Sequence, residues 1–217
     1  MLYALFQWLI KLTAWPVYYL CMRTKIHYED KKVQGRTIKG KAIVASNHRS
    51  VYDVGQMMFL FFTRTLRPVV AEILYTKNFI FTAFLKLLGC IKVDRNAYDV
   101  SFINKSASLI QKGKVIEIYP EARLAKEGEE RPLPFTTSTV YLALETDAPI
   151  IPVYTEGSYF VKTRNHVIVG KPFYARDFYD SSLSHSENVD KITTLLRNKI
   201  VELGKELERR KAKSKKA

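Results

Sequence analysis

The stretch Ala42-Ile43-Val44-Ala45-Ser46-Asn47-His48-Arg49-Ser50-Val51-Tyr52-Asp53 decides the fold. Its first four residues form a continuous apolar run, which is typical of a strand buried on both faces of a sheet. Polar residues follow at once, and the segment 51–62 has the pattern of a helix. A buried strand that passes through a short polar turn into a helix is typical of an α/β domain.

The same alternation continues along the chain on both sides of this stretch. We expect strands at 25–28, 34–38, 42–45, 68–71, 90–93, 115–119, 150–154 and 166–169. We expect helices at 51–62, 78–88, 98–112, 137–145 and from about 186 into the tail, with Gly89 and Gly113 as helix stops. This order predicts an α/β fold, with a largely parallel central sheet flanked by helices, over residues 25–205.

The first 24 residues differ in composition from the rest. Between residues 2 and 22 the only formal charge is Lys11, and aromatic residues are dense. A bilayer span takes roughly 20 apolar residues, and Lys11 and Pro16 inside the segment disfavour a clean span. Trp and Tyr prefer the level of the lipid headgroups, which favours one or two helices lying in a single leaflet. The alternative is a core helix with exposed aromatic side chains.

Basic residues outnumber acidic ones by 35 to 21, which gives a net charge of +14. Such a charge favours nucleic acid, an anionic membrane surface or acidic substrates as partners. Nucleic acid is disfavoured, because the sequence has no recognition-helix pattern and no aromatic strand interleaved with Lys and Arg. Arg23 and Lys25 directly follow the apolar segment, which favours the cytoplasmic face of the cell membrane, with a monotopic or N-terminally anchored chain.

The basic C-terminal tail, residues 206–217, permits two interpretations. It is either a solvated, frayed helix end or a segment attracted to anionic lipid, with about 1 kcal/mol for each basic residue near the surface. The two cysteines, Cys21 and Cys90, lie in apolar surroundings without CxxC or Cys/His spacing. They indicate buried thiols in a reducing compartment, and we expect no metal site.

Polar clusters at 47–53, 92–95 and 121–123 each follow an expected strand, and in parallel sheets sites gather at the carboxyl ends of the strands. His48 and Asp53 are five residues apart, which on one continuous helix would place them about 140° apart. They can meet only if His48 lies in the loop and Asp53 in the first helical turn, with Ser50 as the N-cap. The alternative is that Ser50 and Asp53 form only a capping box and that His48 is an ordinary loop histidine.

The chemistry of such a pair suits transfer to an alcohol. A neutral imidazole can take the proton of a hydroxyl as it attacks a thioester, and Asp53 would orient the ring and stabilise the imidazolium. The acceptor supplies the hydroxyl, so no nucleophile of the chain is needed. Cys90 is the rival nucleophile, but its apolar setting makes it a poor thiolate.

Asn47-His48-Arg49-Ser50-Val51-Tyr52-Asp53 resembles the NHxxxxD block of the glycerolipid acyltransferases, the family of the 1-acylglycerol-3-phosphate acyltransferases (PlsC type). Three further segments resemble the other blocks of that family: Gly89-Cys90-Ile91-Lys92-Val93-Asp94-Arg95, Tyr119-Pro120-Glu121-Ala122-Arg123 and Ile150-Ile151-Pro152-Val153. The four blocks occur in family order between Ala42 and about Val169, which is most of the expected domain.

The resemblance implies a set of roles. His48 is the general base and Asp53 its partner, supported by Asn47, Ser50 and Glu121. The phosphate of the acceptor is bound by Lys92, Arg95 and Arg123, although surface ion pairs with Asp94 or Glu121 are the alternative for these three. Glu121 binds the glycerol hydroxyl or steadies the basic cluster, while Ile151 and Pro152 line the acyl or thioester side. The apolar N-terminus resembles a two-helix membrane anchor.

The implied reaction moves an acyl group from acyl-CoA or acyl carrier protein to 1-acylglycerol-3-phosphate in a ternary complex, without a cofactor. The alternatives are a different lysolipid acceptor or a non-catalytic basic membrane-binding module. Two departures bear on the acceptor: Ala122 replaces the usual Gly of the third block, and Thr136-Thr137-Ser138 replaces a Lys commonly found there. If position 122 needs a positive φ, Ala is disfavoured there.

Overall fold

The computed structural model describes residues 2–94, 100–160 and 163–216. Its strands form one sheet of order β1-β7-β6-β2-β5-β3-β4, in which every neighbouring pair is parallel except β6 and β7. The strands are β1 (Lys25–Tyr28), β2 (Ala42–Ser46), β3 (Leu66–Ala71), β4 (Ile91–Val93), β5 (Val115–Ile118), β6 (Ile150–Thr155) and β7 (His166–Val169). The expected α/β fold with a largely parallel sheet is confirmed.

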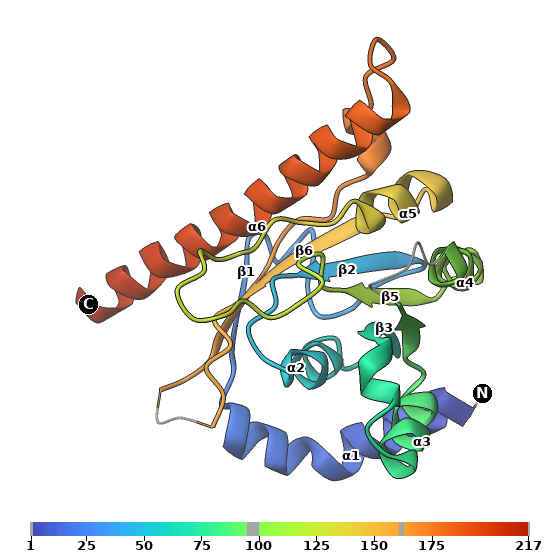
Figure 1. Ribbon diagram of the computed structural model, residues 1–217. Coiled ribbons are helices and arrows are strands. Elements are labelled where there is room, and N and C mark those ends of the chain that lie inside the picture. The colour runs from blue at the N-terminus through green and yellow to red at the C-terminus, as the bar shows by residue number, and fades with distance from the viewer. Residues whose placement is uncertain (1, 95–99, 161–162, 217) are drawn as a thin grey trace.

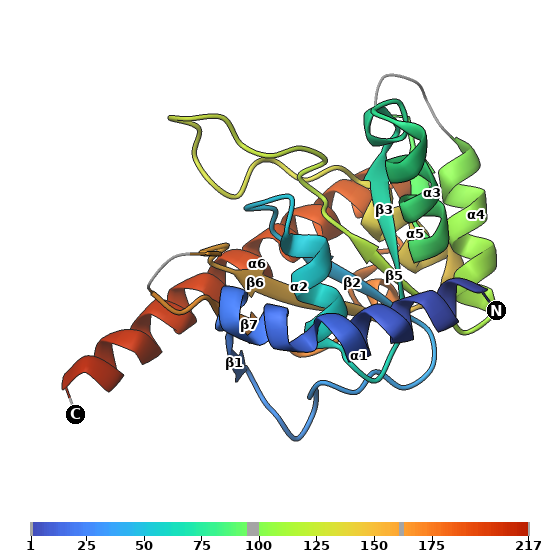
Figure 2. The same cartoon turned by 90° about the horizontal axis from the view of Figure 1, so that it is seen from below.

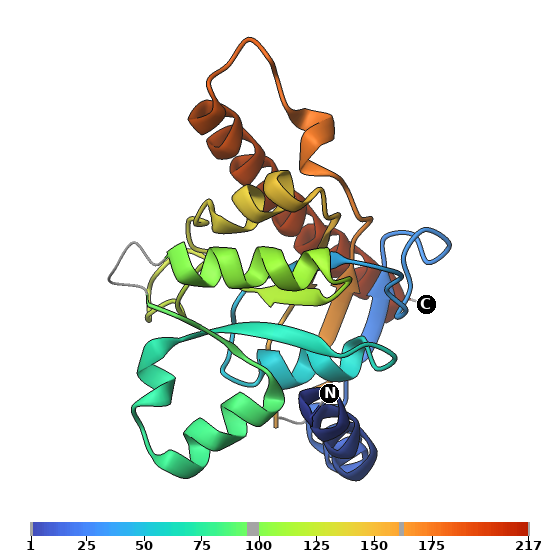
Figure 3. The same cartoon turned by 90° about the vertical axis from the view of Figure 1, so that its right-hand side faces the viewer.

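Helices cover both faces of this sheet. The helices are α1 (Leu2–Met22), α2 (Asp53–Leu60), α3 (Phe79–Leu88), α4 (Val100–Gln111), α5 (Ser138–Thr146) and α6 (His185–Lys216), with 3-10 turns η1 (Glu72–Tyr75) and η2 (Ala175–Phe178). Helices α4, α5 and α6 lie on one face, and α1, α2 and α3 lie on the other (Figures 1 and 3). The sheet is therefore the middle of three layers.

Strand β2 lies at the centre of the sheet, between β6 and β5, and all of its residues are buried. Ile43 and Ala45 pack with α4, α5 and α6, whereas Ala42 and Val44 pack with α2. Successive residues of a strand point to opposite faces, so a strand covered on both sides must be apolar throughout. This confirms the expected buried strand and places the polar stretch that follows it at the carboxyl edge of the sheet.

Helix α1 is one continuous helix that includes Pro16, so the expectation of a two-helix anchor is wrong for this chain. It packs against α2 and α3, along the lower side of the molecule in Figure 1 and across the front in Figure 2. No helix among the described residues is long and apolar enough to cross a membrane. The outward face of α1 is apolar and includes Leu5, Leu12 and Leu20, which are 70%, 63% and 71% exposed.

Two polar side chains fix the inward face of α1 to the domain. The Gln7 amide donates to the carbonyl oxygens of Leu66 (2.6 Å) and Leu88 (2.7 Å), and its own oxygen accepts from the Leu66 N–H at 3.1 Å. Lys11 is fully buried and its Nζ donates to the carbonyl oxygens that follow α2, those of Phe61, Phe62 and Arg64. Lys11 therefore satisfies backbone groups that the end of α2 leaves without helical partners.

Several local expectations change in the structure. Residues 34–38 form no strand; the Gln34 side chain instead donates to the carbonyls of Gly35 and Thr37. Helix α2 begins two residues later and ends two residues earlier than the expected 51–62. Gly89 does end α3, in the left-handed conformation with φ 83°. The proposed boundary at 205/206 falls inside α6, which continues without a break.

Candidate active site

The segment 47–53 leaves β2 at the centre of the carboxyl edge and is fixed on both sides. The Asn47 side chain donates to the carbonyl of Thr155 (2.9 Å) and accepts from its N–H (2.8 Å) at the end of β6. The His48 N–H donates to Oε1 of Glu121, which follows β5, at 2.7 Å. The loop that carries His48 is thus held by the two strands that flank β2.

The His48 and Asp53 side chains meet as the sequence predicts. Nδ1 of His48 lies 2.9 Å from Oδ2 of Asp53, which is fully buried, while the imidazole is 15% exposed. The other ring nitrogen, Nε2, has no hydrogen-bond partner in the described part of the chain. In the tautomer whose Nδ1–H donates to the carboxylate, Nε2 is the acceptor, which is the arrangement that a general base requires.

Asp53 also orders the loop at the start of α2. Its Oδ2 accepts from the N–H groups of Arg49 (2.6 Å) and Ser50 (2.8 Å). The N-cap is Tyr52 rather than the predicted Ser50, whose hydroxyl instead accepts from the Tyr52 N–H at 3.3 Å. The Asp53 carboxylate therefore accepts from the loop N–H groups and contacts His48 at the same time, so Asp53 does more than close a helix end.

The Glu121 side chain is held by two backbone groups. Its two oxygens accept from the backbone N–H groups of His48 (2.7 Å) and Leu133 (2.8 Å), and it is buried. Among the described contacts, neither oxygen bonds to Lys92 or Arg123. Glu121 therefore ties the loop that carries His48 to the connection between β5 and α5.

The ring of Tyr119 forms one side of the histidine's surroundings. It stacks on His48 with 4.5 Å between ring centroids, and its hydroxyl donates to Oε1 of Glu117 at 2.6 Å. Glu117 is fully buried in β5, and burial raises the pKa of its carboxyl to about 8. Burial and the neighbouring carboxyl groups also raise the pKa of Tyr119, which keeps its hydroxyl as a donor.

An apolar cavity of about 280 Å³ opens beside His48. Most of its walls come from β3, α2, α4 and the ends of β4 and β5, and its lining residues are His48, Val51, Val54, Val69, Val70, Ala71, Leu74, Val93, Phe102, Ile118, Tyr119, Ala122, Thr136 and Ser138. The lining is aliphatic and aromatic except near His48, Thr136 and Ser138. Such a shape and lining suit a hydrocarbon chain whose polar end lies at the histidine.

The residues predicted to bind phosphate lie near the same edge but already have carboxylate partners. Lys92 pairs with Glu72. Arg123 pairs through both terminal nitrogens with Glu129, at 2.6 and 2.8 Å. Both pairs are partly exposed, and Arg95 lies outside the described residues. Within the described residues, Lys92 and Arg123 thus form ion pairs with Glu72 and Glu129.

Ala122 has φ 58°, the left-handed conformation that the replacement of the usual Gly put in question. It also lines the cavity. Ile151 and Pro152 lie buried inside the sheet and do not line this cavity. Burial raises the pKa of the Cys90 thiol to about 12, which excludes it as a thiolate nucleophile at neutral pH.

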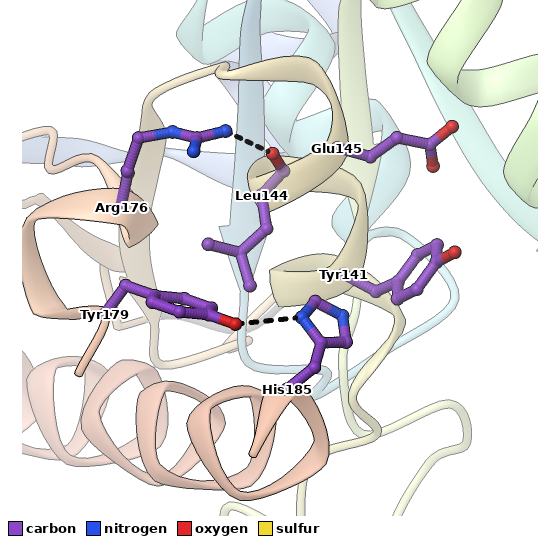
Figure 4. A pocket seen from close by; sticks show the side chains of 6 residues that line it. All are labelled: Tyr141, Leu144, Glu145, Arg176, Tyr179 and His185. Atoms are coloured by element: carbon purple, nitrogen blue, oxygen red, sulfur yellow. Dashed lines mark hydrogen bonds between the residues drawn. The ribbon is translucent and has the colours of Figure 1, made fainter. Parts of the chain in front are cut away.

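A second, larger cavity, of about 510 Å³, lies between α5, η2 and the start of α6 (Figure 4). Tyr141, Arg176, Tyr179 and His185 face it, and the Tyr179 hydroxyl lies 3.4 Å from Nδ1 of His185. None of its lining residues contributes to the cavity beside His48. The smaller cavity, which the paired histidine adjoins, is therefore the candidate active site.

Sequence reasoning missed two groups of this site. Tyr159 donates to Oδ1 of Asp53 at 2.6 Å, although the two residues are 106 positions apart. Glu117 stands in an apolar strand, where a charged residue in the run Val115–Ile118 is itself an anomaly. That anomaly could have indicated a functional carboxyl, whereas no sequence pattern connects Tyr159 to Asp53.

The fold and the paired histidine at the end of a central strand define the class of protein. The Acyltransferase family model matches residues 23–156, which include His48, Asp53 and the residues that line the cavity beside them, and the chain belongs to this family. It is 27% identical over 132 residues to a 1-acyl-sn-glycerol-3-phosphate acyltransferase of Cocos nucifera; the match covers 59% of this chain and 42% of the relative. The chain thus spans less than half the length of that curated relative.

A solved structure also resembles this fold. It is the crystal structure of the 1-acyl-sn-glycerophosphate (LPA) acyltransferase PlsC from Thermotoga maritima. The TM-score is 0.63 at 17% sequence identity, and the match covers 91% of this chain and 79% of the other. At this identity the likeness extends to the arrangement of helices and strands, including the N-terminal helix.

Proposed function

We propose that this protein transfers an acyl group from an acyl thioester to the free hydroxyl of 1-acylglycerol-3-phosphate, which yields phosphatidate. The observation that carries the proposal is the contact between His48 Nδ1 and Asp53 Oδ2, which leaves Nε2 available beside an apolar cavity. The donor is acyl-CoA or acyl carrier protein. Both are acidic, and the net charge of +14 favours their approach.

In this mechanism His48 moves one proton twice. Nε2 takes the proton of the acceptor hydroxyl as its oxygen attacks the thioester carbonyl, and the Asp53 carboxylate stabilises the resulting imidazolium. When the carbon–sulfur bond breaks, the imidazolium returns that proton to the thiolate leaving group. His48 ends the cycle neutral, and the oxygen ester and the free thiol are the products.

The apolar cavity gives the acyl chain a place beside the base. Its volume of about 280 Å³ and its lining from Val54, Val69 and Phe102 suit a hydrocarbon segment. Burial of an aliphatic chain yields about 0.8 kcal/mol for each methylene group. The Thr136 and Ser138 hydroxyls lie at the same cavity and offer hydrogen bonds to the polar part of a substrate.

The phosphate would be bound by Lys92, Arg95 and Arg123. For Lys92 and Arg123 this requires an exchange, because Glu72 and Glu129 now pair with their charged groups. Arg suits a phosphate because its planar guanidinium makes two parallel hydrogen bonds, while Lys adds a point charge. Exposed ion pairs are weak, so a doubly charged phosphate can displace a carboxylate.

The test is an assay of purified protein in detergent or vesicles with lysophosphatidate and a labelled acyl thioester, either acyl-CoA or acyl carrier protein. Wild-type protein should form labelled phosphatidate, and His48→Gln should abolish it without loss of the folded state. His185→Gln, at the second cavity, is the matched control and should retain activity. An active His48→Gln protein contradicts the assignment of the base.

Two observations favour a different lysolipid as a second candidate acceptor: hydroxyls of Thr136 and Ser138 stand where a Lys is common, and Ala122 takes the left-handed conformation. Lys92→Ala and Arg123→Ala distinguish the candidates. If the acceptor carries a phosphate monoester, both changes should raise KM for it far more than for a lysolipid without one. Equal effects on both acceptors favour the second candidate.

We further propose that α1 holds the protein at the cytoplasmic membrane face. Its outward face carries Leu5, Leu12 and Trp15 in exposed positions, while Gln7 and Lys11 face the domain. Leu5→Ser with Leu12→Ser should reduce co-sedimentation with anionic vesicles. Val33→Ser, at an exposed apolar position outside α1, is the control. If wild-type protein binds vesicles but turns over no substrate, a membrane-binding module is favoured.

A further inference from the structure

We propose that Tyr159 is a positioning residue for the catalytic pair: its hydroxyl fixes the Asp53 carboxylate in the orientation that holds His48. This inference rests on the proposed function. The Tyr159 hydroxyl donates to Oδ1 of Asp53 at 2.6 Å, and Tyr159 itself is 8% exposed. It reaches Asp53 from the segment after β6.

The two oxygens of Asp53 have different partners. Oδ2 accepts from Nδ1 of His48 and from the N–H groups of Arg49 and Ser50. Oδ1 accepts from Tyr159, its one partner among the described residues. Because Asp53 is fully buried, loss of the tyrosine hydroxyl leaves one oxygen of a charged group without a hydrogen bond. The carboxylate can then turn to share its donors, which moves Oδ2 away from the histidine.

The direction of the Tyr159 hydrogen bond is fixed. Burial and the nearby Asp53 charge raise the pKa of Tyr159 well above its ordinary value, so the hydroxyl keeps its proton. That single proton is given to Asp53. The hydroxyl of Thr155, 3.4 Å away, must therefore donate to the Tyr159 oxygen. The result is a chain of donors that runs from Thr155 through Tyr159 to Asp53 and supports one orientation of the carboxylate.

The backbone near Tyr159 is held on both sides. The N–H of Phe160 donates to the carbonyl of Cys21 in α1 at 3.2 Å. Gly157 has φ 70°, and a Cβ there would lie 2.2 Å from Cβ of Arg49, next to the catalytic histidine. The segment between β6 and β7 thus packs directly on the catalytic loop, which lets Tyr159 act as a rigid support for Asp53.

The first test compares Tyr159→Phe with Tyr52→Phe. Tyr52 packs edge-on against Tyr159, but its hydroxyl bonds to no described group, so its loss controls for general packing. Tyr159→Phe should lower kcat by about tenfold and leave KM for both substrates unchanged. A tenfold loss is a fraction of the 10²- to 10⁴-fold acceleration that a well-placed general base provides, because the base itself is still present. Tyr52→Phe should leave kcat unchanged. Replacement of Tyr159 by 4-aminophenylalanine, which retains a donor, should restore most of the activity.

A second measurement needs no substrate and so separates this inference from the proposed function. In nitrogen-15 spectra of histidine-labelled protein, with His48→Gln for assignment, the hydrogen-bonded Nδ1 proton of His48 should be present. It should be weakened or shifted in Tyr159→Phe and unchanged in Tyr52→Phe. An unchanged His48 signal, or an equal loss of kcat in both variants, overturns the inference. If wild-type protein turns over no lysolipid, the proposed function fails and the spectra still decide on Tyr159.

Discussion

The hydroxyl of Tyr119 donates to Oε1 of Glu117 at 2.6 Å, while its ring stacks on the imidazole of His48. The other oxygen of Glu117 is buried and has no hydrogen-bond partner among the described residues. Burial raises the pKa of Glu117 to about 8, so a carboxyl that favours its neutral form lies one side chain away from His48. Because the pKa of Glu117 differs between the folded and unfolded states, the free energy of unfolding depends on pH.

We predict that Glu117→Gln makes stability less dependent on pH. The pKa of Glu117 rises from 4.5 to about 8 on folding, so the folded state retains a proton that the unfolded state loses. Stability is therefore greatest below pH 4.5 for this group and falls as the pH rises through about 8. A glutamine side chain can still accept the hydrogen bond from the Tyr119 hydroxyl, and it has no proton to lose over this pH range.

Urea unfolding at about pH 5 and about pH 8 measures this difference, since denaturant slopes convert to free energies of unfolding. The wild-type protein should lose stability between the two values by more than the variant does. The upper pH is kept near 8 because burial lowers the pKa of Lys11 to about 8. Above that pH, the loss of the Lys11 proton in the folded state makes stability rise with pH, which opposes the effect of Glu117. Parallel decreases in the two proteins would show that Glu117 is not protonated.

Asp53→Asn should lower kcat on the order of 10³-fold or more while KM changes little, because the charge that stabilises the imidazolium is removed. The amide oxygen can still accept from the Arg49 and Ser50 N–H groups, so the protein should fold. Asp147→Asn is the control, since Asp147 is an exposed residue at the end of α5. A kcat for Asp53→Asn close to that of the control would contradict the role of the carboxylate.

Glu129→Gln should lower KM for a phosphate acceptor a few-fold. Glu129 holds Arg123 through two hydrogen bonds, at 2.6 and 2.8 Å, and a neutral amide competes less well with phosphate. Glu130→Gln removes the same charge from an exposed neighbour and controls for the change in net charge. Initial-rate measurements over a range of acceptor concentrations give the two constants. An equal KM in both variants would exclude Arg123 as the exchanging group.

Ala122→Gly should raise the free energy of unfolding by roughly 0.5–1 kcal/mol. A left-handed backbone costs a non-glycine residue about 1 kcal/mol or more, and glycine removes this cost. Part of the benefit is lost because glycine gives the unfolded chain more conformational freedom. The φ of Ala122 is 58°. Ala125→Gly, in the same loop but without a positive φ, should be neutral or destabilising. Thermal unfolding of the two variants makes the comparison, and a lower Tm for Ala122→Gly would argue against strain at this residue.

Much of the fold follows from the sequence because its central strands are buried on both faces. The apolar run at Ala42–Ser46 and the helix stop at Gly89 are local signals, and both are confirmed. The expected strand at 34–38 is wrong, because a strand needs a neighbour as well as suitable residues, and Gln34 bonds instead to its own loop. Helix α6 continues into the segment 206–216, which was expected to be a separate tail, because Leu207 is buried against the sheet.

Some contacts of the candidate site also follow from the local sequence, whereas others depend on the fold. His48 and Asp53 are close in sequence, so their contact follows from the placing of a loop before a helix. Lys92 and Arg123 lie near the predicted carboxyl edge of the sheet. Their carboxylate partners, Glu72 and Glu129, lie in connections between strands and helices, where no sequence pattern indicates the pairing. Tyr159 reaches Asp53 only because β6 and β2 are neighbours in the sheet, a fact that composition and spacing do not contain.

The two buried polar side chains of α1 have a consequence for handling the protein. Gln7 and Lys11 complete the hydrogen bonds of β3 and of the end of α2, the helix that begins with Asp53. Removing α1 to obtain a soluble form would therefore expose these backbone groups next to α2. Polar substitutions on the outward face, at positions such as Leu5 and Leu12, would improve solubility while leaving the contacts of Gln7 and Lys11 in place.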